Sequence, residues 1–311
     1  MENKAQNDTQ YDDEIDLREL FGFLWADKIK IIVITAFFAV GSVIYSLSIP
    51  NQYMATALLA PAQSDDGGLS GTLGQLGGLA SLAGVSIGGV ESSESQIAQE
   101  IMKSWSFLEG FIVDNDLAVS VYAVEGWSRE YNQLKIDSDV YEVDTKSWLV
   151  EDDYTGKEGP PSSWQLFEAF TDKLSVSEDK NSGLVSVSIE YYSPQIAKQW
   201  LDLYIAAINK HMQMRQVEKV SNNIIYLENQ IKKTAIAEMQ EVFYNLIAEQ
   251  TKNKMVAEAS PDYAFVAVSP SMVPEERSQP KRLLIFILGT LIGGILSVLL
   301  VLVTHYTRKS D

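Results

Sequence analysis

The pattern of apolar positions is dominated by two long uncharged stretches, one near each end of the chain. Ile31–Ile49 holds 19 uncharged residues and Leu283–Val303 holds 21. At a rise of about 1.5 Å per residue, the second stretch is about 30 Å long as a helix, which matches the hydrocarbon core of a bilayer. It also lacks the polar face of a soluble core helix. We predict transmembrane helices at residues 31–49 and 283–303.

A cleaved signal peptide is the alternative for the first stretch, because Ser46 and Ser48 form a small-x-small pair before Pro50. Signal peptides open with a short basic region, whereas 30 residues with eight acids precede this stretch. The sequence therefore favours a retained membrane helix over a leader.

The basic residues near the first span predict its orientation. Lys28 and Lys30 precede the span, and the next basic residue is Lys103. Because basic residues stay on the cytoplasmic side, residues 1–30 are predicted to be a cytoplasmic tail. With two spans, residues 304–311 form a second cytoplasmic tail, and the segment between the spans lies outside.

Alternating apolar and polar positions predict strands in the first part of the outer segment, residues 50–192. Tyr53–Ala60 is a predicted strand, and Leu174 to Tyr191 reads as a hairpin that turns at "EDKNSG". Between them we expect an amphipathic helix through Ile97, Ile101, Leu108 and Ile112, with Ser93 and Gln96 as its capping box. Trp127, Trp148 and Trp164 are expected to pack in a core or interface, with stacking on sugar rings as the alternative.

A glycine-rich stretch holds nine of the 19 glycines between Gly67 and Gly89. A phosphate-binding loop would require a following Lys and Ser or Thr, and this stretch has no Lys. We expect a flexible apolar loop.

The residues from 193 to 258 predict one very long helix. Ser193 is the expected N-cap with Pro194 at the first helical position, and no Pro or Gly interrupts the next 64 residues. Apolar residues follow a seam with heptad spacing that includes one extra four-residue step: Val217, Val220, Ile224, Leu227, Ile231, then Ala235, Met239, Val242 and Leu246. We interpret the seam as a contact between copies of the chain; a helical hairpin within one chain is the alternative.

The amino-acid composition excludes several kinds of partner and reaction. Between Pro50 and Pro280 there are 33 acidic and 16 basic residues, a net charge of −17, which argues against a nucleic-acid partner. The absence of cysteine excludes disulfides and thiol chemistry. His211 is interpreted as a solvated or hydrogen-bonded side chain, and no residues are predicted to be catalytic, metal-binding or cofactor-binding.

Three passages in the right order resemble a known family. They are "DEIDLRELFGFLW" with "IPNQYMATALLAP", the passage "SGLVSVSIEYYSPQIAKQWLDLYI", and the approach to the second span, "VAVSPSMVPEERSQPKR", in which Pro270, Pro274 and Pro280 keep the spacing. The chain thus resembles bacterial polysaccharide co-polymerases of the Wzz type, which determine polysaccharide chain length. Some relatives carry a tyrosine kinase domain, which we do not expect here because the chain ends at Asp311.

The resemblance implies an α+β protein with two transmembrane helices around a periplasmic domain. That domain would have an α/β base near the membrane at residues 50–192, a long helix at 193–258 and a Pro-rich return at 259–282. It also implies a non-enzymatic inner-membrane homo-oligomer that works with a separate membrane polymerase, and the growing glycan is a further partner to consider. Gly289 and Gly293 form a GxxxG pattern in the second span, where we expect helix packing.

Two other functions are weighed against length control. A periplasmic adaptor for capsule or exopolysaccharide export would also use long helices, but such adaptors usually have one span. A membrane-anchored glycan hydrolase or transferase would require paired carboxylates in a cleft. The resemblance leaves open whether the polysaccharide is O-antigen, capsule, exopolysaccharide or common antigen.

Overall fold

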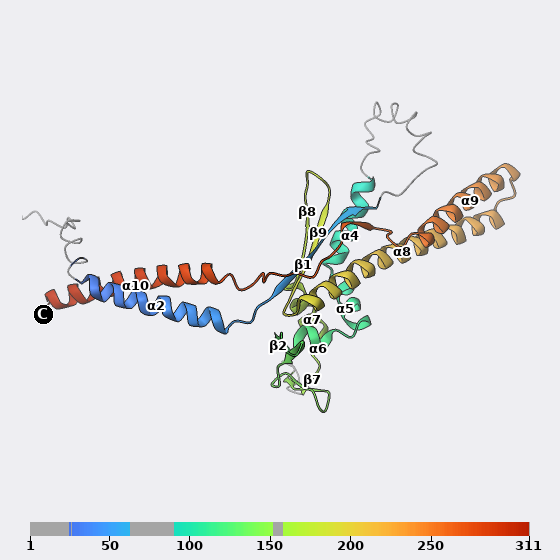
Figure 1. Ribbon diagram of the computed structural model, residues 1–311. Coiled ribbons are helices and arrows are strands. Elements are labelled where there is room, and N and C mark those ends of the chain that lie inside the picture. Colours follow the sequence, from blue (N-terminus) through green and yellow to red (C-terminus); the bar gives the residue numbers. More distant parts are fainter. Residues whose placement is uncertain (1–24, 26, 63–89, 152–157, 311) are drawn as a thin grey trace, which may run out of the picture. The chain divides into compact units, whose positions relative to one another are not determined.

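The computed structural model describes residues 25, 27–62, 90–151 and 158–310 (Figure 1). The chain divides into two compact units, one formed by residues 1–49 with 279–311 and the other by residues 50–278. The expected glycine-rich loop at 67–89 lies outside the described residues.

The first unit contains two long apolar helices, α2 (Lys28–Ser48) and α10 (Arg282–Ser310), which pack side by side (Figure 1). Both are long and apolar enough to cross a membrane. Most of their large apolar side chains remain exposed in the single chain, as a lipid-facing surface requires. Lys28, at the start of α2, lies 4.6 Å from the ring centre of Trp25.

The second unit mixes helices with a four-stranded sheet, so the predicted α+β class is confirmed. The strand order is β10-β1-β9-β8, all antiparallel. Its strands are β1 (Tyr53–Pro61), β8 (Leu174–Glu178), β9 (Val185–Tyr191) and β10 (Phe265–Ser269). The strand predicted at Tyr53–Ala60 and the hairpin predicted from Leu174 to Tyr191 are both confirmed.

Shorter elements connect β1 to β8. The helices are α4 (Val90–Met102), α5 (Trp105–Asp114), α6 (Ala118–Tyr122) and α7 (Ser163–Thr171). Three two-stranded ribbons are formed by β2 (Val124–Ser128) with β3 (Gln133–Ile136), β4 (Tyr141–Glu142) with β5 (Ser147–Trp148), and β6 (Val150–Glu151) with β7 (Glu158–Gly159).

The single amphipathic helix predicted through Ile97 and Ile112 is wrong in two respects. The helix ends at Met102, and a separate helix, α5, begins at Trp105. Ser104 caps α5 by accepting a hydrogen bond from the Phe107 N–H. The capping box predicted at Ser93 is also wrong, because α4 already begins at Val90. Leu108 and Ile112 are fully buried as expected, whereas Ile97 is exposed.

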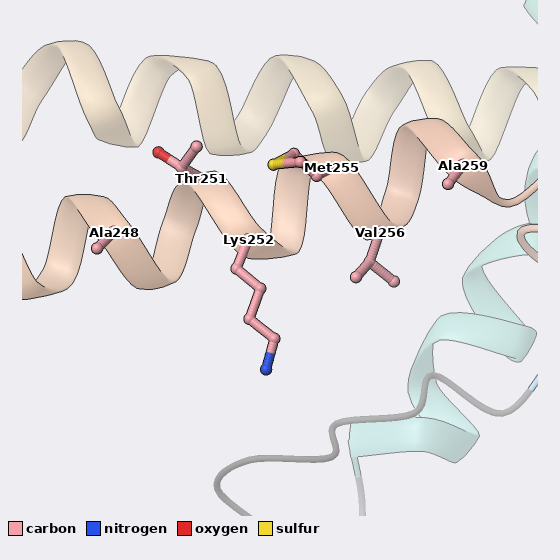
Figure 2. A pocket seen from close by; sticks show the side chains of 6 residues that line it. All are labelled: Ala248, Thr251, Lys252, Met255, Val256 and Ala259. Carbon is pink, nitrogen blue, oxygen red and sulfur yellow. The ribbon is translucent and has the colours of Figure 1, made fainter.

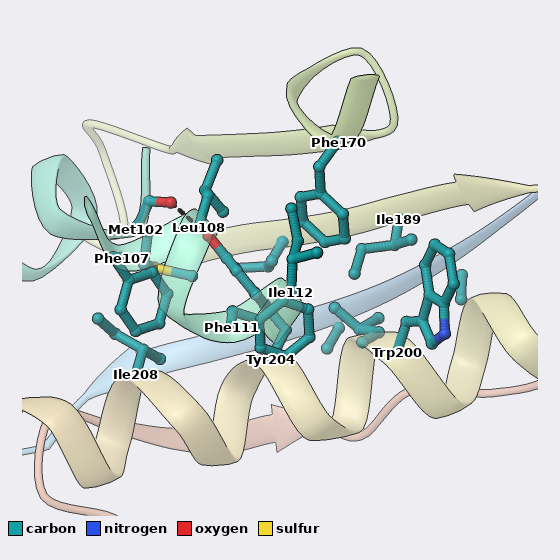
Figure 3. Close-up of a cluster of buried hydrophobic side chains, with 14 of the residues drawn as sticks. Met102, Phe107, Leu108, Phe111, Ile112, Phe170, Ile189, Trp200, Tyr204 and Ile208 are labelled. Atoms are coloured by element: carbon teal, nitrogen blue, oxygen red, sulfur yellow. Dashed lines mark hydrogen bonds between the residues drawn. The ribbon is translucent and has the colours of Figure 1, made fainter. Parts of the chain in front are cut away.

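The hydrophobic core lies where one face of the sheet meets α5, α7 and the first half of α8 (Pro194–Lys233). Figure 3 shows Phe107 and Phe111 of α5 beside Tyr204 of α8, with Phe170 of α7 close by. The Tyr204 hydroxyl donates to the Met102 carbonyl, which satisfies a buried phenol. Alternate residues of β9 complete this core, as its period-two pattern predicted.

The long helix predicted without a break to residue 258 is wrong in its length. α8 begins at Pro194, as predicted, and ends at Lys233 after 40 residues. A second helix, α9 (Ala237–Ala259), then runs back along α8 (Figure 1). Ser193 occupies the N-cap position, but its hydroxyl donates to Gln195 and makes no cap hydrogen bond. The alternative of a helical hairpin within one chain is the one that the structure adopts.

Candidate functional site: the α8–α9 hairpin and the paired membrane helices

The break between α8 and α9 occurs at the stutter in the apolar seam. Thr234 and Ile236 have extended backbone angles, and the Gln240 side chain donates to the Thr234 carbonyl at 2.7 Å. Both residues are β-branched, which disfavours the helical conformation slightly. Neither Pro nor Gly marks the site, so apart from these two β-branched residues the extra step in the apolar spacing was the only sequence signal for the turn.

The first half of the predicted seam is covered by the same chain. Val217, Val220, Ile224, Leu227 and Ile231 are buried or half-buried on the distal part of α8, against which α9 packs. The apolar α9 residues with reduced exposure are Phe243, Ile247 and Ala257. The hairpin therefore buries this part of the apolar stripe without a second copy of the chain.

The second half of the predicted seam is not covered. Met239 and Leu246 are 43% and 39% exposed, and Val242 between them is 50% exposed. Tyr244, Met255 and Val256 are also exposed on α9. At 100° per residue, Met239, Val242 and Leu246 fall on one side of the face that packs on α8, and Tyr244 and Met255 fall on the other. α9 thus presents apolar residues on both sides.

A shallow hollow of about 560 Å³ lies along α9. Figure 2 shows its six lining residues, all from this helix, with Lys252 and Val256 pointing away from α8: Ala248, Thr251, Lys252, Met255, Val256 and Ala259. The hollow is open and mostly apolar, with one cation at its rim. Its shape fits a packing surface better than an enclosed small-molecule site.

The GxxxG pattern of the second span packs against the first span of the same chain. A Cβ atom at Gly293 would lie 2.5 Å from Phe38 Cβ, and one at Gly289 would overlap the Ser42 side chain. One helical turn after Gly293 on α10, the Ser297 hydroxyl is hydrogen-bonded to the Thr35 hydroxyl of α2 at 3.3 Å. These glycines therefore allow close approach of α2 and α10, so in this structure their face of α10 is already occupied.

The three tryptophans have different surroundings. Trp127 makes an edge contact with Tyr53 at 6.1 Å, and Trp148 contacts Tyr141 at 4.9 Å, so both pack on other aromatic rings. Trp164 also contacts an aromatic ring, that of Phe167 at 5.1 Å, but it is 56% exposed and donates to Glu168 at 2.8 Å.

No group of three or more His, Asp and Glu side chains is placed to hold a metal ion within the described part of the chain. Burial lowers the pKa of Lys173, but its ammonium donates to the Ala169 carbonyl, and its strongest neighbouring charge is Asp172. Burial raises the pKa of Tyr191, whose hydroxyl donates to the Ser120 carbonyl.

The Pro-rich return is attached to the second unit at both ends. Pro270 follows the last residue of β10, and Ser271 donates to Asp202 of α8. Ser278 donates to Glu190 of β9, and its N–H donates to the Gln52 carbonyl at 2.8 Å. Pro274 lies between these contacts and Pro280 precedes α10.

Comparison with known proteins gives one match to a family model. Residues 13–114 match the model of the chain length determinant protein, Wzz. The matched segment covers about a third of the chain and includes α2, β1 and α4. The resemblance to Wzz-type co-polymerases is thereby confirmed.

Three solved structures are similar to the chain at low identity. A full-length bacterial polysaccharide co-polymerase has 15% identity and a TM-score of 0.44, covering 95% of this chain and 99% of that one. A fragment of WzzB, a polysaccharide co-polymerase from Salmonella Typhimurium, has 14% identity and a TM-score of 0.30, covering 74% and 100%. A mutant of the Shigella flexneri lipopolysaccharide O-antigen chain-length regulator has 10% identity and a TM-score of 0.24, covering 73% and 100%. No curated protein matches the chain by sequence.

Proposed function

We propose that the chain is a non-enzymatic regulator of polysaccharide chain length in a bacterial inner membrane. The observation that carries this proposal is the Wzz family match at residues 13–114. The two helices long enough to cross a membrane support a two-pass topology with both termini cytoplasmic and the 50–278 unit periplasmic. The polysaccharide is O-antigen of lipopolysaccharide, built by a separate membrane polymerase.

The regulator acts as a homo-oligomer, and its contacts between copies use the apolar sides of α9 that remain exposed. Two different apolar sides on one helix favour a head-to-tail contact, in which one side of a copy meets the other side of the next. Such contacts close into rings when the rotation between copies divides a full turn. Of the predicted seam, the α9 residues Met239, Val242 and Leu246 therefore remain as the contact between copies, and the opposite side of α9 at Met255 is added.

A gel of surface polysaccharide from a deletion strain tests the proposed function. We expect the clustered length distribution to become featureless when the gene is removed, and to return when the gene is supplied on a plasmid. An unchanged ladder in the deletion strain would contradict length control and would favour the export-adaptor alternative.

Reporter fusions test the topology separately. Alkaline phosphatase fused after Ser310 should be inactive and green fluorescent protein at the same site fluorescent, because the former folds only outside the cytoplasm. Phosphatase activity at that position would contradict a cytoplasmic C-terminus.

A further inference from the structure

Three polar residues on one face of α8 contact the chain that returns from α9. Asp202, Asn209 and Gln213 are seven and four residues apart, so they lie along one face of the helix. Their partners lie between Ala257 at the end of α9 and Ser271 just beyond β10, and run in the opposite direction to α8. We call these three residues the polar stripe.

Asn209 is the most deeply buried member, at 2% exposed. Its Nδ2 donates to the Phe265 carbonyl at 2.9 Å, and its Oδ1 accepts from the N–H groups of Ala264 and Phe265 at 2.9 and 2.8 Å. β10 is an edge strand of the sheet. The amide therefore takes the place of a neighbouring strand at the first residue of β10.

Gln213 and Asp202 hold the chain on either side of that point. The Gln213 Nε2 donates to the carbonyls of Ala257 and Ser260 at 2.9 and 3.0 Å, where α9 ends. Asp202 accepts from the Ser271 hydroxyl. The carbonyls at the end of a helix have no partners within it, so the Gln213 contact also caps α9.

These hydrogen bonds can fix the register of α9 on α8, which the apolar seam cannot do. A seam of regularly spaced apolar residues packs almost equally well after one helix slides along the other by a turn, because apolar contacts are not directional. A buried amide bonded to particular backbone groups is satisfied in one register only, and an unsatisfied buried amide is costly. Buried polar residues fix the register of coiled coils in this way.

We propose that Asn209 and Gln213 are positioning residues that set the register of α9 on α8, and that the preferred polysaccharide length depends on this register. The second half of the proposal rests on the proposed function. The register determines the height along α8 at which each exposed α9 residue lies. It therefore also determines which residues of neighbouring copies come into contact.

The register is measured on the full-length protein in nanodiscs by electron spin resonance. The chain has no cysteine, so spin labels attached at Met214→Cys and Glu241→Cys are the only ones. Labelled copies are diluted with an excess of the unlabelled, cysteine-free chain, so that labels on neighbouring copies add no distances of their own. We then expect one intramolecular distance in the otherwise unchanged protein. Asn209→Leu and Gln213→Met should add a second distance, displaced by about 5 Å, because one turn of helix rises by that amount.

Matched controls make the same chemical changes at exposed positions of α8, namely Asn222→Leu and Gln199→Met. Both should keep the single distance. A single unchanged distance in Asn209→Leu and Gln213→Met would overturn the proposal. If Asn209→Leu lowers the amount of folded protein, the test relies on Gln213→Met. Gln213 is only half-buried, so its replacement should disturb folding less.

The same variants are then compared by polysaccharide gel at equal protein amounts. A shifted or broadened length distribution in the two stripe variants, with a normal one in the controls, supports the link to length. A normal distribution despite a displaced register overturns that link. Failure of the proposed function is recognised separately, because the deletion strain itself would then show an unchanged ladder.

Discussion

At the scale of single residues, the fold depends on a few polar groups buried next to aromatic rings. Tyr204 is fully buried among Phe107, Phe111 and Phe170, and burial raises the pKa of its phenol well above the ordinary value. His211 lies about two turns further along α8, with the centre of its ring 5.4 Å from that of Phe107. These contacts join α5 to α8, which is where the hairpin leaves the core.

His211 gives this contact a pH dependence. Burial, and to a smaller extent the charge of Arg215, lower the pKa of His211 from 6.5. The folded state therefore favours the neutral ring, and the unfolded chain takes up the proton first as the pH falls. We expect the free energy of unfolding to decrease as the pH drops through about 6.5, and to level off below the folded-state pKa.

The test measures the unfolding free energy of the second unit between pH 5 and 8 by hydrogen exchange in the full-length protein. In His211→Gln, the part of the pH dependence due to this ring should disappear. Identical curves for His211→Gln and the unchanged chain would contradict the assignment.

At the scale of elements, the pairing of α2 with α10 depends on two glycines. Gly293→Leu would place a side chain where Phe38 now lies, and overpacking of this kind typically costs about 1–3 kcal/mol. We expect the two helices to separate locally. The measurement is the disulfide yield of Thr35→Cys with Ser297→Cys, whose native hydroxyls are 3.3 Å apart.

Gly294→Leu is the matched control, because a Cβ atom there would meet nothing within 4 Å. The disulfide yield should fall in Gly293→Leu and stay high in Gly294→Leu. Equal yields in both variants would show that the glycines are not needed for the pairing.

The hairpin offers a second test at this scale. Leu227→Asp would place a charge between α8 and α9, and we expect it to loosen α9 by about 2–4 kcal/mol. Hydrogen exchange of the α9 amides should then become faster. Ile225→Asp is the control, because Ile225 is 55% exposed. Protection of α9 that is equal in the two variants would contradict the packing of Leu227 in the hairpin.

At the scale of the whole molecule, the exposed apolar sides of α9 are expected to join copies of the chain. Val242→Glu and Met255→Glu, one on each side, should each lower the mass of the purified particle. Because the contact is head-to-tail, one altered side is enough to prevent ring closure. Mass is measured by native mass spectrometry in detergent.

Asn222→Glu on α8 is the control for added charge, and it should leave the particle mass unchanged. A full-size particle from both α9 variants would contradict the proposed contact. A monomer from the unaltered chain would contradict the homo-oligomer itself.

The elements with a local signal could be predicted from the amino-acid sequence. Two uncharged runs predict the two long apolar helices, and period-two alternation predicts β8 and β9 with the turn between them. Pro194 marks the start of α8, because its fixed φ suits the first turn of a helix. These features depend on residues close together in the chain, so their periodicity is sufficient.

Which apolar and polar surfaces meet could not be predicted from local patterns, because it depends on long-range packing. The apolar seam of α8 could be buried by another copy of the chain or by the chain itself. The turn at 234–236 reverses the chain, so that α9 covers this seam. Gly293 could pack against any helix, and the fold places Phe38 there. Asn209 reads in the sequence as an ordinary polar residue of a helix, although it binds the start of β10, 56 residues away. Apolar burial is not directional, so the pattern predicts that a surface must be covered, while long-range packing decides what covers it.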